Sequence, residues 1–244
     1  MKITPQTLKK AFSALGHSWS KTQPNLIGIR TALNVPNVFN DLFVAVFTQP
    51  VIGSHLRLTE LQHQLNAYGY TGSNGLPLKE DGKPGAQTSY ALAQHQATAG
   101  TERLLAWPVT TEPGTYYLQQ PLSAGGCAVL VPAQYPGAYV LGYHQSKPDH
   151  PALVQHGGPV TIYRDNDRDG LAEAMGERES GMFGINIHRS QKEGATPVIA
   201  NWSAGCQVFQ RRDHLTQLLA LCEQYRAGNK NRFTYTLISE KSLA

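Results

Sequence analysis

Apolar and polar positions change their spacing several times along the chain, and each spacing predicts a type of element. Apolar side chains recur every three or four residues from about residue 4 to residue 15, which predicts a short amphipathic helix. Strand-like runs rich in apolar residues follow at 26–30 and 42–47, on either side of a segment with turn-forming Asn34, Pro36 and Asn37. Two strand-like runs joined in this way predict a β-hairpin.

After residue 50 the residue pattern becomes typical of helices. Helices are predicted over 58–68 and 86–98, joined by a Gly-rich, Asp-containing turn over 69–85. Strand-like runs resume at 105–109 and recur at 114–118, 128–132, 138–144, 160–163 and 184–188, and Gly and Pro residues punctuate the later runs. We therefore predict a mainly β domain, a sandwich or barrel with flanking helices, formed by 1–50 and 105–244 and interrupted by a small all-α domain at 51–104.

A further helix is predicted over 213–225, followed by a polar turn and a last strand at 233–238. Leu215, Leu218, Leu219 and Cys222 fall at positions i, i+3, i+4 and i+7 of that helix. This spacing places Cys222 on the buried stripe, so its thiol is expected to fill space in the core.

Composition and charge narrow the function classes. The net charge of +4 is compatible with weak attraction to an anionic polymer such as a cell wall, but the chain lacks the dense Lys/Arg runs of a nucleic-acid binder. Neither an apolar run of transmembrane length nor the apolar core of a signal peptide is visible. We expect a soluble monomer, made in the cytoplasm, that reaches a wall or periplasm after release or delivery.

Candidate chemistry centres on one of three cysteines. Cys127, Cys206 and Cys222 are too few and too irregularly spaced for a disulfide framework. Cys206 follows Trp-Ser-Ala-Gly, where Gly205 permits a tight turn. A nucleophilic thiol needs an imidazole nearby and backbone N–H groups directed at the developing oxyanion, and His188 at the end of a predicted strand is the candidate base.

Taken singly, a Cys is more often a packed small hydrophobe, and a His is more often a hydrogen-bonded or surface residue. The combination is more specific: fourteen residues separate His188 from the Ser-x-Gly-Cys that runs from Ser203 to Cys206. This spacing resembles the signature of L,D-transpeptidase catalytic domains, and residues 112–116 are similar to a strand entry of that family. The resemblance implies that Cys206 is the nucleophile, that His188 is the base, and that Ser203 and Gly205 shape the oxyanion site.

In that family the Cys attacks the amide between the third and fourth residues of a peptidoglycan stem and forms an acyl-enzyme, without a cofactor. Four residues near the motif are assigned to substrate binding: Asn186, Arg189, Trp202 and Gln207. Ala204 and Gln207 differ from the residues usual in the motif, on its acceptor side. Hydrolysis is favoured because water needs no acceptor pocket, so we predict an endolysin-like peptidoglycan hydrolase. A crosslinking or D-amino-acid-exchanging L,D-transpeptidase and a non-catalytic wall-binding protein remain alternatives.

The predicted helical insertion carries a second resemblance. Its residues are similar in order and spacing to the three-helix peptidoglycan-binding domain of type 1, which implies peptidoglycan as the binding partner. The alternative is a helical insertion that only stabilises the enzyme. The matching positions are Leu61, Gln62, Tyr70, Asp81, Gly82, Gly85, Thr88 and Gln96.

One further motif resembles a metal site. Asp165, Asp167, Asp169 and Gly170 match the opening of a calcium-binding loop. The twelfth position is Gly176, where such a loop needs a bidentate Glu. We therefore favour a hydrated hairpin turn and assign no metal.

Overall fold

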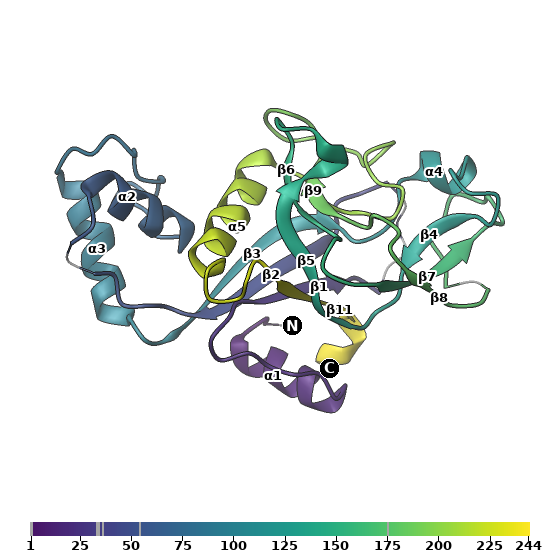
Figure 1. The fold of residues 1–244 in the computed structure, drawn as a ribbon, viewed down its shortest axis with the longest axis horizontal. Coiled ribbons are helices and arrows are strands. Elements are labelled where there is room, and N and C mark those ends of the chain that lie inside the picture. Colours follow the sequence, from purple (N-terminus) through teal and green to yellow (C-terminus); the bar gives the residue numbers. More distant parts are fainter. Residues whose placement is uncertain (1, 33–34, 36, 54, 175) are drawn as a thin grey trace.

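Most strands form one closed barrel in the computed structural model, which describes residues 2–32, 35, 37–53, 55–174 and 176–244 (Figure 1). Around the barrel the order is β1 (Asn25–Arg30), β11 (Phe233–Ser239), β5 (Gln134–Tyr143), β6 (Pro151–Val154), β9 (Ile187–Arg189), β10 (Gln207–Phe209), β3 (Glu102–Thr110) and β2 (Asp41–Thr48). A second sheet contains β4 (Cys127–Leu130), β7 (Val160–Asp165) and β8 (Glu179–Gly181). The predicted mainly β fold is confirmed.

Aromatic side chains fill the barrel interior. Phe43 is fully buried and stacks on Tyr235 with ring centroids 5.6 Å apart, while the Phe209 ring lies 5.1 Å away. Gly28 faces the same space, and a Cβ atom there would overlap the Tyr235 hydroxyl. Successive side chains along each strand point to opposite faces, so every second side chain points into the barrel and those between them point outward.

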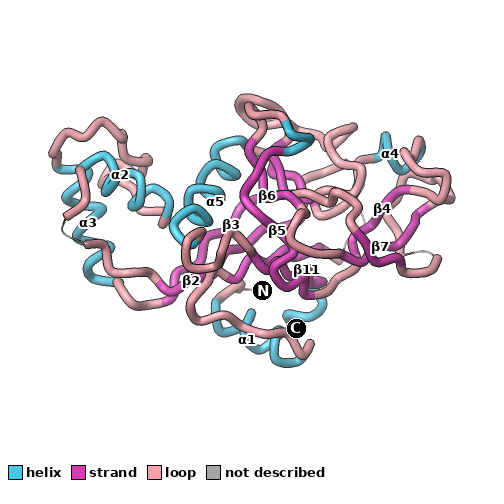
Figure 2. The backbone as a smooth tube through the Cα atoms, viewed as in Figure 1, coloured by secondary structure: helices cyan, strands magenta, loops and turns pink. Residues whose placement is uncertain are grey.

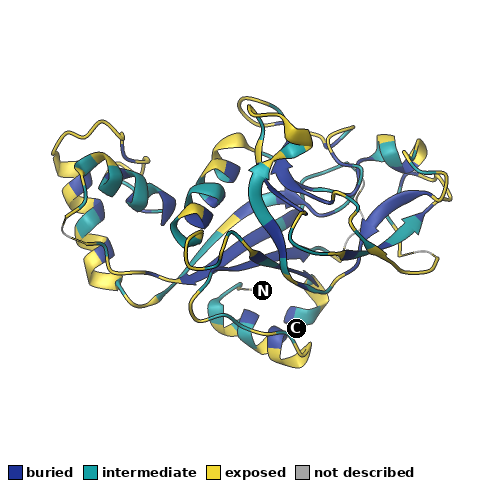
Figure 3. Cartoon of the chain, in the orientation of Figure 1, coloured by how far each residue is buried: buried dark blue, intermediate teal, exposed yellow. Residues whose placement is uncertain are grey.

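The outward set on β1 and β2 packs against α1 (Pro5–Ala14) in a smaller apolar cluster. Ile27 and Val44 from the strands meet Leu8 and Phe12 from the helix, and Figure 3 shows the buried face of α1 turned toward the sheet. The helix begins at Thr4, whose hydroxyl accepts from the Thr7 N–H in a capping box. The predicted N-terminal helix and the β1–β2 hairpin are both confirmed.

On the other side of the barrel lies α5 (Arg212–Tyr225), whose Leu215, Leu218 and Cys222 belong to the main core. Cys222 is fully buried, as its place on the stripe predicts. None of the helices in the described part of the chain is long and apolar enough to cross a lipid bilayer.

Two α-helices, α2 (Leu58–Ala67) and α3 (Ala86–Thr98), lie between β2 and β3 in sequence and extend from the barrel at the end opposite β4, β7 and β8 (Figure 1). Their buried side chains are continuous with the barrel core, because the Phe47 ring contacts the rings of both Tyr68 and Tyr225. The helix positions match the predicted ranges closely. A separate all-α domain is not shown, and the described residues of 51–104 contain two α-helices where the resemblance implies three.

One predicted strand is wrong, and another is shorter than predicted. Residues 114–118 begin a short helix, α4 (Thr115–Gln119), in which Leu118 is buried while Tyr116 is half exposed, and loops surround it (Figure 2). Gly114 precedes it, and its N–H donates to the Ser203 carbonyl at 2.8 Å. The run 184–188 forms a strand only from Ile187, because Gly184 has a φ of +71° and leaves the β region. The predicted turn at Asn34 and Pro36 lies outside the described residues.

The barrel interior predicts a stability experiment. Phe43→Ala should lower the free energy of unfolding by about 3–5 kcal/mol, because a fully buried ring would be replaced by a cavity. Urea unfolding followed by fluorescence would measure the loss. Leu122→Ala, at a side chain that is 79% exposed, is the matched control and should change the value by less than about 0.5 kcal/mol. Equal values for the two variants would contradict the assignment of Phe43 to the core.

Candidate active site

The parallel pairing of β9 with β10 brings together the two segments that carry the candidate residues. Gln207 lies opposite Ile187, and the Gln207 N–H donates to the Asn186 carbonyl at 2.9 Å. Ile187 and Gln207 are fully buried and face the barrel interior. Because paired residues of parallel strands point to the same side and neighbours alternate, Asn186, His188 and Cys206 share the outer face.

A tight turn presents Cys206 to this face. Gly205 has a φ of +122°, and a Cβ atom there would lie 2.5 Å from the Ala128 carbonyl oxygen. The buried Ser203 hydroxyl donates to the Cys206 carbonyl at 2.8 Å and accepts from the Gly205 N–H at 3.2 Å. Strand β4 therefore fixes the turn from outside, and Ser203 fixes it from within.

Cys206 is half-buried, whereas Cys127 and Cys222 are buried. Its Sγ accepts from the Asn186 backbone N–H at 3.4 Å and donates to the Gly184 carbonyl at 3.5 Å. Burial raises the pKa of the Cys206 thiol to about 11, and the Asn186 N–H opposes part of that rise. The thiol is therefore neutral at pH 7 before a substrate or base acts on it.

His188 is only 2% exposed, and its two ring nitrogens differ. Nδ1 lies 2.7 Å from the Arg189 carbonyl, which accepts, so this nitrogen carries the proton and Nε2 has the lone pair. Nε2 is buried, and none of the residues that the structure describes hydrogen-bonds to it. Burial, followed by the neighbouring His144, lowers the pKa of His188 well below its usual range. His188 thus has a vacant acceptor nitrogen.

The hydrogen bond between thiol and imidazole that the sequence predicts is not formed in this arrangement, because Cys206 Sγ bonds to Asn186 and Gly184 instead. In this register Asn186 lies beside Cys206. His188 is two residues further along the chain, a separation of about 7 Å along the strand. Catalytic hydrogen bonds are often long or absent without substrate. The pairing of Cys206 with His188 stays a prediction.

Two further histidines surround His188. The His144 ring stacks on it with centroids 4.0 Å apart, and the His150 ring lies 5.3 Å away at a steep angle. Asn186 links this cluster to the thiol, because its Nδ2 donates to His144 Nδ1 at 3.1 Å. Burial, then the charges of His150 and other cations, lowers the pKa of His144 to about 4. Sequence reasoning missed both residues, since isolated histidines in a loop form no pattern.

Asn186 and Gln207, predicted to bind substrate, make their contacts within the protein. Asn186 Oδ1 accepts from the Gln155 N–H at 2.9 Å. Gln207 is fully buried, and its Oε1 accepts from the Tyr235 hydroxyl at 2.9 Å. These contacts orient the strands that carry the site.

Arg189 and Trp202 differ in their access to a substrate. Arg189 is buried, and its guanidinium donates to the carbonyls of Asp149 and Ser190 at 3.1 and 3.5 Å. Trp202 is 37% exposed and leaves part of its ring open to solvent. Of the two predicted contacts, only the Trp202 ring is presented to solvent here.

A pocket of about 220 Å³ lies beside the Cys206 turn, between the barrel and the small sheet. Gly184, whose carbonyl contacts Cys206 Sγ, and Ala204 form one side, while Ala128 and Arg164 from β4 and β7 form another. Arg164 is the charged residue among its lining, and no sequence motif predicts its place there. The remaining lining residues are Leu122, Ser123, Gly126, Cys127, Phe183 and Ile185.

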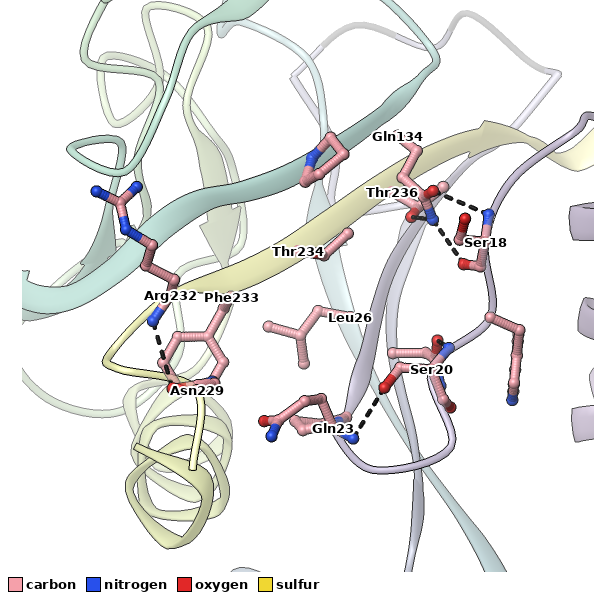
Figure 4. Close-up of a pocket in the computed structure, with 14 residues that line it drawn as sticks. Ser18, Ser20, Gln23, Leu26, Gln134, Asn229, Arg232, Phe233, Thr234 and Thr236 are labelled. Carbon is pink, nitrogen blue, oxygen red and sulfur yellow. Dashed lines mark hydrogen bonds between the residues drawn. The ribbon is translucent and has the colours of Figure 1, made fainter. Parts of the chain in front are cut away.

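A separate cleft of about 240 Å³ opens between the segment after α1 and strand β11 (Figure 4). Gln134 bridges it by accepting from the Ser18 N–H at 2.9 Å and donating to the Ser18 carbonyl at 2.8 Å. The Arg232 guanidinium points away from Leu26 and Phe233 at its floor. None of the predicted catalytic residues lines this cleft.

The residues matched to a wall-binding module form a hydrogen-bonded centre between α2 and α3. Gln62 is buried, accepts from the Gly82 N–H at 2.9 Å and donates toward Asp81 and Thr88, each at 3.3 Å. Gly82 adopts a φ of +68°, and Gly85 is the N-cap residue of α3. These residues fix the turn between the two helices.

The remaining matched residues occupy different environments. Tyr70 is buried and its hydroxyl bonds to Thr98 at 2.6 Å, Leu61 is half-buried, and Gln96 is exposed. A groove of about 300 Å³ lies along the turn, lined by Gln62, Asp81, Gly85 and Thr88 among others. The structure therefore places half of the matched residues at one surface groove.

The calcium-like motif forms turns. Asp167 and Asp169 accept from backbone N–H groups two residues onward, and the buried Asp165 accepts from the Glu173 N–H at 2.8 Å. Within the described residues, no three His, Cys, Asp or Glu side chains lie where they could hold a metal ion together.

Comparison with protein-family models, curated proteins and solved structures finds no match to this chain. The two resemblances carried by its motifs stay predictions.

The pKa of Cys206 predicts how its alkylation depends on pH. Because the pKa is raised to about 11, the reactive thiolate fraction should rise about tenfold per pH unit between about pH 6 and pH 9. Iodoacetamide labelling followed by peptide mass spectrometry would give the rate for each cysteine separately, with Cys206→Ser as the blank. A rate that is already constant above pH 6 would instead indicate a preformed thiolate–imidazolium pair.

Proposed function

We propose that this chain is a peptidoglycan hydrolase that cleaves a stem-peptide amide through an acyl-enzyme on Cys206. The observation that carries the proposal is the placement of a half-buried thiol and a histidine with a vacant Nε2 on one face of paired strands, beside a pocket. Reactive cysteines are usually partly exposed, whereas Cys127 and Cys222 are buried.

In the first step, Cys206 Sγ attacks the amide carbon and its proton passes to His188 Nε2. The carbonyl oxygen becomes an oxyanion. The Cys206 backbone N–H makes no hydrogen bond within the described residues and is available to donate to that oxyanion. Collapse breaks the C–N bond, and the amine leaves with the proton held by His188, so that a thioester remains.

In the second step, water attacks the thioester while His188 Nε2 accepts its proton. Cleavage of the C–S bond releases the acid, and the proton on Nε2 returns to Sγ to restore the neutral thiol. Because both groups begin neutral, the proton is transferred during attack, as in general base catalysis. The reaction requires movement of Sγ from its contacts with Asn186 and Gly184 toward the imidazole.

A wall-binding role of the α2–α3 segment belongs to the same proposal. The groove between these helices lies at the opposite end of the molecule from the small sheet (Figure 1). A glycan-bound segment at that end would hold the enzyme on its polymer while stems enter near Cys206. The proposal treats these as two contacts with one substrate.

Cys206→Ala should abolish the release of soluble muropeptides from purified sacculi, by at least about 1,000-fold, because the attacking atom is lost. Chromatography of the soluble fraction measures release, and co-sedimentation with sacculi measures binding. Binding should persist, since the α2–α3 groove is unchanged. Undiminished release by the variant would overturn the role of Cys206.

The product mass separates hydrolysis from exchange. Muropeptides incubated with the enzyme and a free D-amino acid should gain water at the cleaved bond. Products that carry the amino acid instead would identify a transpeptidase.

A further inference from the structure

The pocket beside Cys206 has an uneven chemical lining. Burial raises the pKa of Cys127 to about 12, so that thiol is neutral, and Arg164 supplies the single charge among the lining residues. The other groups are apolar side chains, glycines and one serine. A pocket with one cation and apolar walls suits a ligand that combines a carboxylate with aliphatic groups.

Several contacts orient the Arg164 side chain. It extends from β7, its guanidinium lies over the Phe183 ring at 5.3 Å from the centroid, and its Nη1 donates to the Gly126 carbonyl at 3.5 Å. Its Nε lies 3.2 Å from a Glu179 carboxylate oxygen on β8. The Arg164 side chain is 22% exposed and that of Glu179 is 48% exposed.

We propose that Arg164 is a specificity-determining residue that binds a carboxylate of the stem peptide next to the scissile amide. This proposal rests on the proposed function and names the substrate group that the same site selects. The planar guanidinium matches a carboxylate through two parallel N–H donors. Its place on β7 gives the small sheet a role as the substrate-binding wall opposite the Cys206 turn.

Glu179 is the internal competitor for this carboxylate. The Glu179 side chain is 48% exposed and that of Arg164 is 22% exposed, so water screens the attraction from the Glu179 side, and ordering the Glu179 side chain costs entropy. A substrate carboxylate held in the pocket can therefore replace Glu179, whose side chain is the more exposed of the two. Before binding, Glu179 keeps the guanidinium beside the pocket.

Two carboxylates of a stem peptide have the required chemistry. One is the α-carboxylate of the terminal residue, and the other is a side-chain carboxylate on the residue that forms the thioester. Synthetic stems amidated at one position or the other distinguish the two sources.

The test compares kcat/KM for carboxylated and amidated stems in the wild type and in Arg164→Gln. The wild type should prefer one carboxylated stem by about 10- to 100-fold, and Arg164→Gln should reduce that preference to near unity. Arg164→Lys should restore part of the preference, because the positive charge remains while the two parallel N–H donors of the guanidinium are lost. An equal fall for both stems in Arg164→Gln would overturn the proposal and assign Arg164 a structural role.

Two neighbouring residues provide controls. Arg178→Gln removes a cation directly before β8 whose Nε donates to the Tyr163 hydroxyl and which does not line the pocket, so the preference should be unchanged. Glu179→Gln removes the competitor and should lower KM for the carboxylated stem by up to about fivefold. Loss of preference in Arg178→Gln would indicate a general effect of charge and would contradict the assignment.

Binding measurements on uncleaved stems test the role of Arg164 independently of catalysis by Cys206. In a Cys206→Ala background, calorimetry should show the same Arg164-dependent preference in Kd for uncleaved stems. If the preference appears in Kd while the wild type cleaves nothing, the inference stands and the proposed function fails. If the wild type cleaves stems without preference, the inference fails and the proposed function stands. Absence of both preference and cleavage overturns both.

Discussion

The site depends on the close approach of Gly205 to the backbone of β4. No side chain fits between Gly205 and the Ala128 carbonyl, and the positive φ of Gly205 turns the chain so that Cys206 enters β10 on its outer face. Parallel pairing with β9 then places His188 on the same face. A shift of one residue in this register would send Cys206 into the aromatic interior. The chemistry of the thiol therefore follows from a backbone contact.

Burial leaves both proposed reactants uncharged. It raises the pKa of Cys206 and lowers that of His188, so an ion pair is not the resting state. The histidine is held by the Arg189 carbonyl on one nitrogen and by the stacked His144 ring, while no residue in the described part of the chain bonds to its other nitrogen. An immobilised base with an unused lone pair fits proton transfer that is triggered by substrate, and in the proposed reaction the Cys206 side chain makes the remaining movement.

The sequence predicts secondary-structure elements best where the hydrophobic pattern extends over many residues. The 3.6-residue period of α5 and the apolar-rich runs of β1 and β2 identify these elements, because each buries a regular stripe. The short α4 has one buried residue and therefore shows no helical period of apolar positions. Its aromatic residues predict a strand instead. The turn from Ser203 to Cys206 is visible in the sequence because its conformation requires Gly and Ser. Arg164 and His144 reach the site only through tertiary packing, which leaves no local signal.

The central claim is that Cys206 carries a covalent acyl intermediate, and intact-protein mass spectrometry after rapid acid quenching tests it most directly. During turnover of a stem peptide, the account predicts a protein mass increased by the acyl part of the stem, with the adduct mapped to Cys206 and labile to hydroxylamine. Turnover with no adduct on Cys206, or with an adduct on another residue, would contradict the account.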